Sequence, residues 1–197
     1  MVLLMKEIDA LRRKAFEYRD AGLTTYEIAK DLNVSKDTIE WLLSQDAVEK
    51  PEGDVKIGWR SVGVRPTRIS WIAEAMYDII IEEIQKRKIS VEGIVGIAIN
   101  GIPFATYVAE NLDVDFSVFR PDDEKRGSFS SNFATVKGKN IIIIDDVVGT
   151  GMTLSNTIKQ TIADGGNVVL CVSLVNKTAL NEIDGIPLRS LVRARSI

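Results

Sequence analysis

The chain has 197 residues, of which 45% are hydrophobic and 27% charged, and its formal net charge is −3. This length is enough for a buried core and a small second domain. No apolar run is long enough to span a membrane. The apolar stretch at the start of the chain is too short, and charged residues follow it too early, for a signal peptide. We therefore expect a cytoplasmic protein with no membrane partner.

Two residue types limit the chemistry. The chain contains no histidine, which excludes Ser-His-Asp and Cys-His catalysis and leaves proton transfer to Asp, Glu, Lys or Tyr. The single cysteine, Cys171, lies in an apolar run and cannot form an internal disulfide. We expect it to be a packed strand residue, and a Cys/His metal site is excluded.

Residues 1–50 have the pattern of three helices. Gly22 ends the first, Thr24 or Thr25 can cap the second, and Ser35 can cap the third. Between the second and third helices the spacing is that of a helix-turn-helix. We therefore expect residues 1–50 to form a helix-turn-helix domain.

Within this motif, Ala29 allows close helix crossing and Asn33 tolerates the left-handed turn. Ile39 and Leu42 then anchor the third helix on the core, and its exposed side would face a DNA major groove. The DNA-binding candidates are Thr25, Ser35, Lys36 and Thr38.

Charge argues against strong electrostatic binding by this domain. Residues 1–50 hold eight Lys or Arg and ten Asp or Glu, which is not the basic footprint typical of DNA-binding proteins. The alternative is a three-helix bundle that contacts another protein. The turn pattern, and not the charge, favours DNA binding.

The segment Asp46–Asp54 is polar and contains Pro51 and Gly53, so we place a linker at 51–58 and a second domain at 59–197. Strands alternate with helices in the second domain, which predicts an α/β fold with a parallel sheet covered on both faces. The expected elements are an irregular segment Trp59–Pro66, a helix Arg68–Lys88, a strand Gly93–Ile99, a helix Phe104–Leu112, a strand Phe116–Arg120, a long polar loop Pro121–Lys139, a strand Ile141–Ile144, a helix Thr153–Ala163, a strand Asn167–Val175 and a final segment Ile186–Ile197.

The most informative stretch follows the strand Ile141–Ile144, which we expect to stop at Asp145 and Asp146. A turn with two glycines comes next, and a helical pattern opens at Thr153. A strand, a glycine turn and a helix start direct amide N–H groups and the helix dipole at one point, where a phosphate binds well. The paired carboxylates suit neighbouring sugar hydroxyls or a hydrated magnesium ion. The alternative is a strand that ends at an ordinary polar turn.

This stretch is neither a Walker phosphate loop, because no lysine precedes Thr153, nor a complete dinucleotide fingerprint. It resembles the phosphoribosyl-pyrophosphate (PRPP) motif of type I phosphoribosyltransferases. The resemblance implies that family's fold, a parallel sheet flanked by helices with a small hood. It also implies that the two acids bind the ribose hydroxyls and that the loop holds the 5′-phosphate.

A second strand-turn-helix, Asn100-Gly101-Ile102-Pro103, resembles the family's pyrophosphate loop. No cofactor is required, but a magnesium ion that arrives with PRPP would lie near Asp145 and Asp146. The residues that the resemblance assigns to PRPP or a nucleotide are Ile99, Asn100, Gly101, Asp145, Asp146, Val147, Val148, Gly149, Thr150, Gly151, Met152 and Thr153.

The chain departs from the catalytic members of the family. Asn100 stands where many of these enzymes have a lysine. In the mobile loop of orotate phosphoribosyltransferases, Arg120 matches, but Pro121 and Glu124 take two lysine positions. Each lost donor to the departing pyrophosphate can cost roughly two to three orders of magnitude in rate, so we doubt turnover. The remaining catalytic candidates in the loop are Arg120, Lys125 and Arg126.

A resemblance over the whole chain is to archaeal DNA-binding, phosphoribosyltransferase-like regulators. It is carried by the helix-turn-helix, by Arg65-Pro66-Thr67-Arg68 and by Gly127–Ala134. It implies a homodimeric transcriptional regulator of sugar or nucleotide metabolism that binds promoter DNA and senses PRPP or a nucleotide. Two alternatives stay open: an active phosphoribosyltransferase for orotate or another base, and a protein-interaction domain joined to an inactive enzyme.

Overall fold

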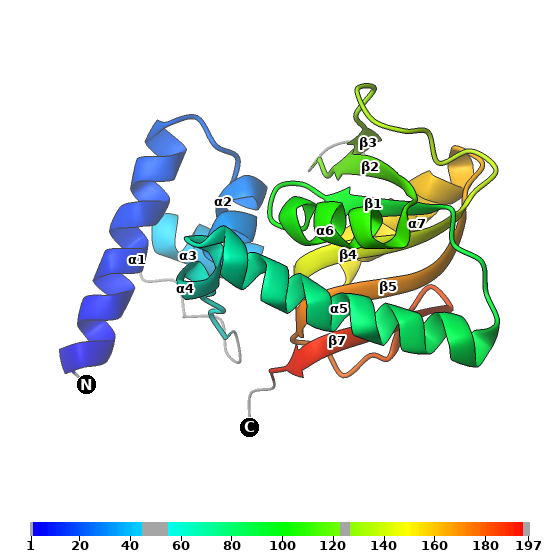
Figure 1. Ribbon diagram of the computed structural model, residues 1–197. Helices are drawn as coiled ribbons and strands as arrows, with labels where there is room; N and C mark the ends of the chain where they lie inside the picture. The colour runs from blue at the N-terminus through cyan, green and yellow to red at the C-terminus, as the bar shows by residue number, and fades with distance from the viewer. Residues whose placement is uncertain (1, 45–54, 123–126, 195–197) are drawn as a thin grey trace. The chain divides into compact units, whose positions relative to one another are not determined.

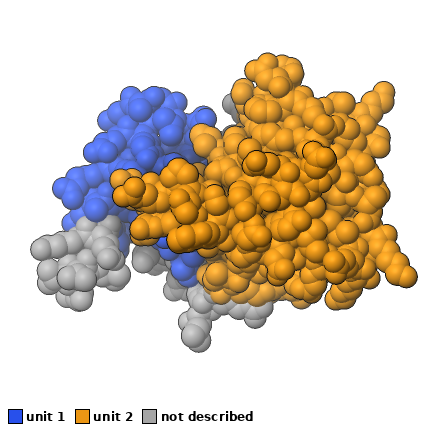
Figure 2. All heavy atoms as spheres, in the orientation of Figure 1, with its two compact units in different colours: residues 1–58, 196–197 blue, residues 59–195 orange. Residues whose placement is uncertain are grey.

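The computed structural model describes residues 2–44, 55–122 and 127–194, with side chains described from residue 8 onward. The chain divides into two compact units, residues 1–58 and 59–195 (Figure 2). The division falls between Gly58 and Trp59. The second domain predicted from the sequence also begins at residue 59. The polar segment Asp46–Asp54, on which the linker prediction rests, lies outside the described residues.

The first unit consists of α1 (Val2–Asp20), α2 (Thr25–Leu32) and α3 (Lys36–Leu43). Thr24 caps α2 in a capping box, because its N–H donates to Glu27 Oε2 at 2.8 Å and its hydroxyl accepts from the Glu27 N–H at 3.3 Å. Asn33 then turns the chain in the left-handed conformation, with φ 54°. The buried core of this unit consists of Ala15, Ile28, Ala29, Leu32, Ile39 and Leu42.

The second unit is built on a seven-stranded sheet with the order β3-β2-β1-β4-β5-β7-β6 (Figure 1). The five inner strands are parallel to one another, in the order β2, β1, β4, β5 and β7. The edge strands β3 and β6 are antiparallel to their neighbours. The elements are α4 (Arg60–Gly63), α5 (Pro66–Arg87), β1 (Gly93–Ile97), α6 (Ile102–Leu112), β2 (Asp115–Arg120), β3 (Ser128–Phe129), β4 (Asn140–Val148), α7 (Met152–Ala163), β5 (Asn167–Asn176), β6 (Glu182–Ile183) and β7 (Ile186–Arg193).

Both faces of this sheet are covered, as predicted. Strand alternation places Ile141 and Ile143 on one face, where they form a buried cluster with Leu154 and Ile158 of α7. On the other face, Gly96 lies so close to α6 that a Cβ atom would come within 2.9 Å of the Ala105 Cβ. Figure 1 shows α5 and α6 in front of the sheet and α7 behind it.

Three expectations about the second unit are wrong. Part of the segment Trp59–Pro66 is not irregular but forms α4, closed by a hydrogen bond from the Val62 N–H to the Trp59 carbonyl at 2.8 Å. Strand β1 ends at Ile97, because the chain turns at once into α6, and Ile99 is 78% exposed. The strand that begins before Ile141 continues through both acids to Val148, because its backbone stays paired with β5 to Asn176.

No helix in the described part of the chain is both long enough and apolar enough to cross a membrane.

Cys171 lies fully buried in β5, and this burial raises the pKa of its thiol. Because the thiolate is the reactive form, we predict that the folded protein does not react with a thiol reagent such as DTNB. Denaturation should release one thiol per chain. The measurement is absorbance on DTNB addition with and without guanidinium, and rapid reaction of the native protein would contradict this packing.

Candidate functional site

The candidate site lies at the edge of the sheet where β1 and β4 end. These two strands are adjacent and parallel, with Gly96 opposite Ile144, so the loops that follow them emerge at the same edge. The chain leaves β1 toward β2 on one side and β4 toward β5 on the other. In α/β sheets, ligands bind at such a reversal of strand order, beyond the carboxyl ends of the strands.

Two helices begin at this edge, α6 after β1 and α7 after β4. Gly101 and Gly151 are their N-cap residues and have no side chain that could cap the helix, although the Met152 N–H donates to the Thr150 hydroxyl at 3.3 Å. The first amide N–H groups of a helix have no partner within it, and the helix dipole makes that end positive. The edge therefore presents two positive helix ends, an arrangement that favours an anionic ligand.

Gly101 determines how closely the start of α6 approaches the end of β4. A Cβ atom there would lie 2.5 Å from the Ile144 carbonyl oxygen and 2.8 Å from that of Ile97. Both are backbone atoms of neighbouring strands and cannot move aside. Only glycine therefore allows α6 to begin directly against the end of β4.

Asp145 and Asp146 are almost completely buried, with 2% and 1% exposure. As consecutive residues of one strand they point to opposite faces of the sheet. Asp145 lies on the face covered by α7, and its Oδ1 accepts a hydrogen bond from the Asp146 N–H at 3.0 Å. Asp146 lies on the face covered by α6. The pair is therefore not one two-carboxylate cluster but two separately held acids.

Asp146 is held by two nitrogen donors from distant parts of the sequence. Its Oδ2 accepts from the Trp59 indole N–H at 2.8 Å and from the Asn100 amide at 3.1 Å. Its Oδ1 is buried and has no hydrogen-bond partner among the described residues. A buried carboxylate oxygen without a donor is costly, and a ligand hydroxyl would satisfy it.

The glycine loop after β4 is open to solvent. Gly149, Thr150 and Met152 are exposed, and a Cβ atom at Gly149 would meet no atom within 4 Å. Gly151 has φ +86° and is buried. Of the remaining predicted ligand residues in this stretch, Val147 and Thr153 are half-buried, and Val148 is buried in the α7-side core.

The predicted catalytic residues are only partly described. Arg120 is exposed at the end of β2, while Lys125 and Arg126 lie outside the described residues. Sequence reasoning missed Trp59, which it placed in an irregular segment. No sequence signal marks this residue, because its partner Asp146 is 87 positions away.

The DNA-binding candidates occupy different environments. Lys36, the first residue of α3, has a 53% exposed side chain, and its Nζ lies 4.0 Å from Glu40 Oε1. Ser35 is the N-cap of α3, and Thr25 is the half-buried first residue of α2. Thr38 does not lie on the exposed side as expected. It is 7% exposed, and its hydroxyl bonds to that of Ser35 at 2.9 Å.

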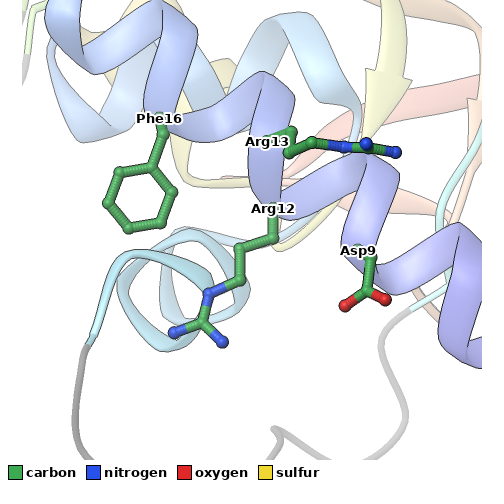
Figure 3. A pocket seen from close by; sticks show the side chains of 4 residues that line it. All are labelled: Asp9, Arg12, Arg13 and Phe16. Carbon is green, nitrogen blue, oxygen red and sulfur yellow. The ribbon is translucent and has the colours of Figure 1, made fainter.

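A hollow of about 620 Å³ lies on the first unit, lined by Asp9, Arg12, Arg13 and Phe16 of α1 (Figure 3). The Arg12 guanidinium donates to the Ser44 carbonyl at 2.5 Å and so ties α1 to the end of α3. Figure 3 shows Arg13 pointing in another direction. Arg12 thus has a structural role within the first unit.

Comparison with known proteins identifies the class. The family described as "Phosphoribosyl transferase domain" matches residues 66–187. Transcriptional regulator GfcR of Thermoplasma acidophilum is 48% identical over 195 residues, covering 98% of each chain. That of Picrophilus torridus is 43% identical, covering 96% of this chain and 98% of its own. The crystal structure of orotate phosphoribosyltransferase from Aeropyrum pernix shares the fold, with a TM-score of 0.61 at 18% identity over 86% of this chain and 93% of that chain.

The chain belongs to the phosphoribosyl transferase domain family and, within it, to the archaeal proteins named transcriptional regulator GfcR. This membership confirms the predicted type I phosphoribosyltransferase fold and the resemblance to archaeal regulators.

The crowding at Gly101 gives a test of the site's construction. We predict that Gly101→Ala lowers the free energy of unfolding by about 1–3 kcal/mol, because its methyl group would collide with two backbone carbonyls. Gly149→Ala, which meets open space, should leave it nearly unchanged. Urea unfolding of the two variants makes the comparison, and equal stabilities would show that α6 does not approach β4 this closely.

Proposed function

We propose that this chain is a DNA-binding transcriptional regulator whose phosphoribosyltransferase domain binds PRPP or a nucleotide as its effector. The observation that carries the proposal is a helix-turn-helix unit in one chain with a sheet edge at which a buried, incompletely satisfied acid lies near two helix N-termini. Relatives that match nearly the whole chain are named as transcriptional regulators, which supports the same function.

In this proposal each part of the edge takes one part of the ligand. The open loop from Gly149 to Thr153 holds the 5′-phosphate at the start of α7, and Asp146, on the face covered by α6, receives the ribose hydroxyls. The loop from Ile99 to Ile102, at the start of α6, holds a pyrophosphate where one is present. Backbone N–H groups and helix dipoles supply most of the attraction, since few cations are needed at such sites.

The chain holds no metal by itself in this proposal. Among the described residues no three Asp, Glu, Cys or His side chains gather into a possible metal site. The two acids point to opposite faces of the sheet, which does not suit joint coordination of one ion. A magnesium ion would therefore arrive with a diphosphate, bound chiefly by its oxygens.

Turnover is not part of the proposal. Asn100 stands where many phosphoribosyltransferases have a lysine. Its side-chain amide donates a hydrogen bond to Asp146 and adds no positive charge. A departing pyrophosphate needs preorganised donors aimed at its developing charge. A sensor needs only the binding half of this machinery, and the chain retains that half.

DNA binding is assigned to α3. Its exposed residues include Lys36, Asp37 and Glu40, so this surface carries both signs of charge. Base readout and a paired half-site would then contribute more to recognition than total charge. We propose a homodimer because a two-fold protein matches two half-sites about one helical turn apart.

The first test is capture of genomic fragments by the purified protein at near-physiological salt. We predict recovery of fragments that share a repeated half-site. Lys36→Ala should weaken their binding several-fold, because it removes an exposed cation at the start of α3. Lys86→Ala, an exposed lysine of α5, is the control with the same charge change. Recovery of fragments that share no sequence would contradict sequence-specific DNA binding and favour the alternative, a helical domain that contacts another protein.

The effector half is tested by calorimetric titration with PRPP. We predict that Asp146→Asn weakens binding at least about tenfold, since charge-assisted hydrogen bonds contribute roughly 1.5–3 kcal/mol. Asp78→Asn, at an exposed position of α5, removes the same charge and should bind like the wild type. Equal affinity in all three proteins would place the ligand elsewhere, and no binding would remove PRPP as the effector.

The enzyme alternative is tested by pyrophosphate release from PRPP with orotate and with purine and pyrimidine bases. We predict no release above the protein-free rate. Base-dependent release that Asp145→Asn and Asp146→Asn abolish would make the chain a phosphoribosyltransferase.

A further inference from the structure

Trp59 joins the candidate effector site to the start of the second unit. It is the first residue of that unit, and its predecessor, Gly58, is the last of the first unit's main segment. Its indole N–H donates to Asp146 Oδ2, and its ring lies 5.4 Å from the Phe104 ring at an interplanar angle of 53°. The residue that begins the second unit therefore contacts one of the two acids directly.

Burial means that a ligand cannot reach Asp146 while this contact is closed. The residue is 1% exposed, and its unsatisfied Oδ1 has no access to solvent. For a sugar hydroxyl to donate to this carboxylate, a neighbouring group must move. The two side chains seen to donate to Asp146 are those of Trp59 and Asn100.

Asn100 is the more tightly held of the two. It lies in the short turn between β1 and α6, flanked by hydrogen bonds from the Ala98 N–H to the Phe119 carbonyl at 2.8 Å and from the Gly101 N–H to the Ile97 carbonyl at 3.0 Å. The crowding around Gly101 fixes the same turn. Its backbone therefore has little freedom to withdraw.

Trp59 has more freedom to move. It is half-buried, and it precedes a helix of only four residues. Its indole contacts the Asp146 carboxylate, the Phe104 ring and Gly63, at which a Cβ atom would lie 2.9 Å from the indole. Its carbonyl accepts from the Val62 and Gly63 N–H groups of α4, so a movement of Trp59 also moves the start of α4. An indole of this kind can exchange its N–H for a ligand O–H with little disturbance of the sheet.

We propose that a phosphoribosyl effector displaces the Trp59 indole from Asp146, and that this displacement transmits occupation of the site to the segment leading to the helix-turn-helix unit. The inference rests on the proposed function and names its regulation. In the free protein, the Trp59 N–H occupies the carboxylate that the ribose needs. In the bound protein, sugar hydroxyls satisfy both carboxylate oxygens, and the start of α4 takes another position.

This mechanism predicts that removal of the Trp59 N–H raises the affinity for PRPP. Because Trp59 competes with the ligand, Trp59→Phe should bind PRPP about three- to tenfold more tightly, as removal of a competing closed state raises apparent affinity. A residue that only lined the pocket or supported the fold would give weaker binding. Phenylalanine keeps a ring against Phe104 and lacks only the donor and part of the ring area.

The same variant should lose the coupling between ligand and DNA. In the wild type, PRPP affinity should differ at least about fivefold between free and DNA-bound protein, and DNA affinity should shift by the same factor. In Trp59→Phe this ratio should fall to about one. Trp71→Phe, at a 69% exposed tryptophan of α5, is the matched control and should keep the wild-type ratio.

The test is calorimetric PRPP titration of the wild type, Trp59→Phe and Trp71→Phe, each with and without its captured DNA fragment. Tighter PRPP binding with a ratio near one in Trp59→Phe alone supports the proposal. A wild-type ratio in Trp59→Phe, or weaker binding by it, overturns the proposal while leaving the regulator function intact. Absence of PRPP binding or of DNA capture by the wild type instead contradicts the proposed function.

If Trp59→Phe does not fold, a second measurement tests the proposal on the wild type. The chain has three tryptophans, so the wild type labelled with 5-fluorotryptophan should give three ¹⁹F signals. We expect PRPP to shift one signal strongly and to leave the exposed Trp71, identified with Trp71→Phe, unchanged. Trp41→Phe then separates Trp41 from Trp59. An unshifted Trp59 signal at saturating PRPP would overturn the proposal.

Discussion

The parallel pairing of β1 with β4 is the constraint on which the rest of the site depends. It brings two strand ends to one edge and requires the chain to turn twice within a small space. Gly101 permits the first turn, because any Cβ atom there would meet the carbonyl of Ile144. The starts of α6 and α7 then lie at the same edge of the sheet, where their positive dipole ends favour an anionic ligand.

In our proposal, the buried acid Asp146 gives this edge a preference for ligands with hydroxyl groups. Asp146 cannot gain its remaining hydrogen bond from bulk water, because its Oδ1 is out of contact with solvent. The structure supplies two nitrogen donors to the other oxygen, one from the β1–α6 turn and one from the first residue of the unit. In our proposal, a ligand that brings hydroxyl donors replaces the Trp59 donor and satisfies both carboxylate oxygens, and this favours a sugar over a simple anion.

The sequence predicted most of the fold, and the site that it predicted stays a prediction. The run Ile141–Ile144 indicated the central strand, and Asn33 together with Thr24 or Thr25 indicated the ends of α2. The stretch Asp145 to Thr153 predicted a phosphate-binding loop. The sequence did not predict that β4 would continue through both acids, since that depends on pairing with β5. Nor did it predict the burial of Thr38, whose hydroxyl joins the cap of its own helix. The contact of Trp59 with Asp146 is a tertiary contact with no local pattern.

The most direct test of the account is the DNA affinity of the wild type and of Asp146→Asn, measured by fluorescence anisotropy on a captured fragment as PRPP is added. The account predicts that PRPP shifts the wild-type dissociation constant at least about fivefold, a typical lower bound for coupled sites. The same additions should leave Asp146→Asn unchanged. A wild-type affinity that does not respond to PRPP or to a nucleotide, or an equal response in Asp146→Asn, would contradict it.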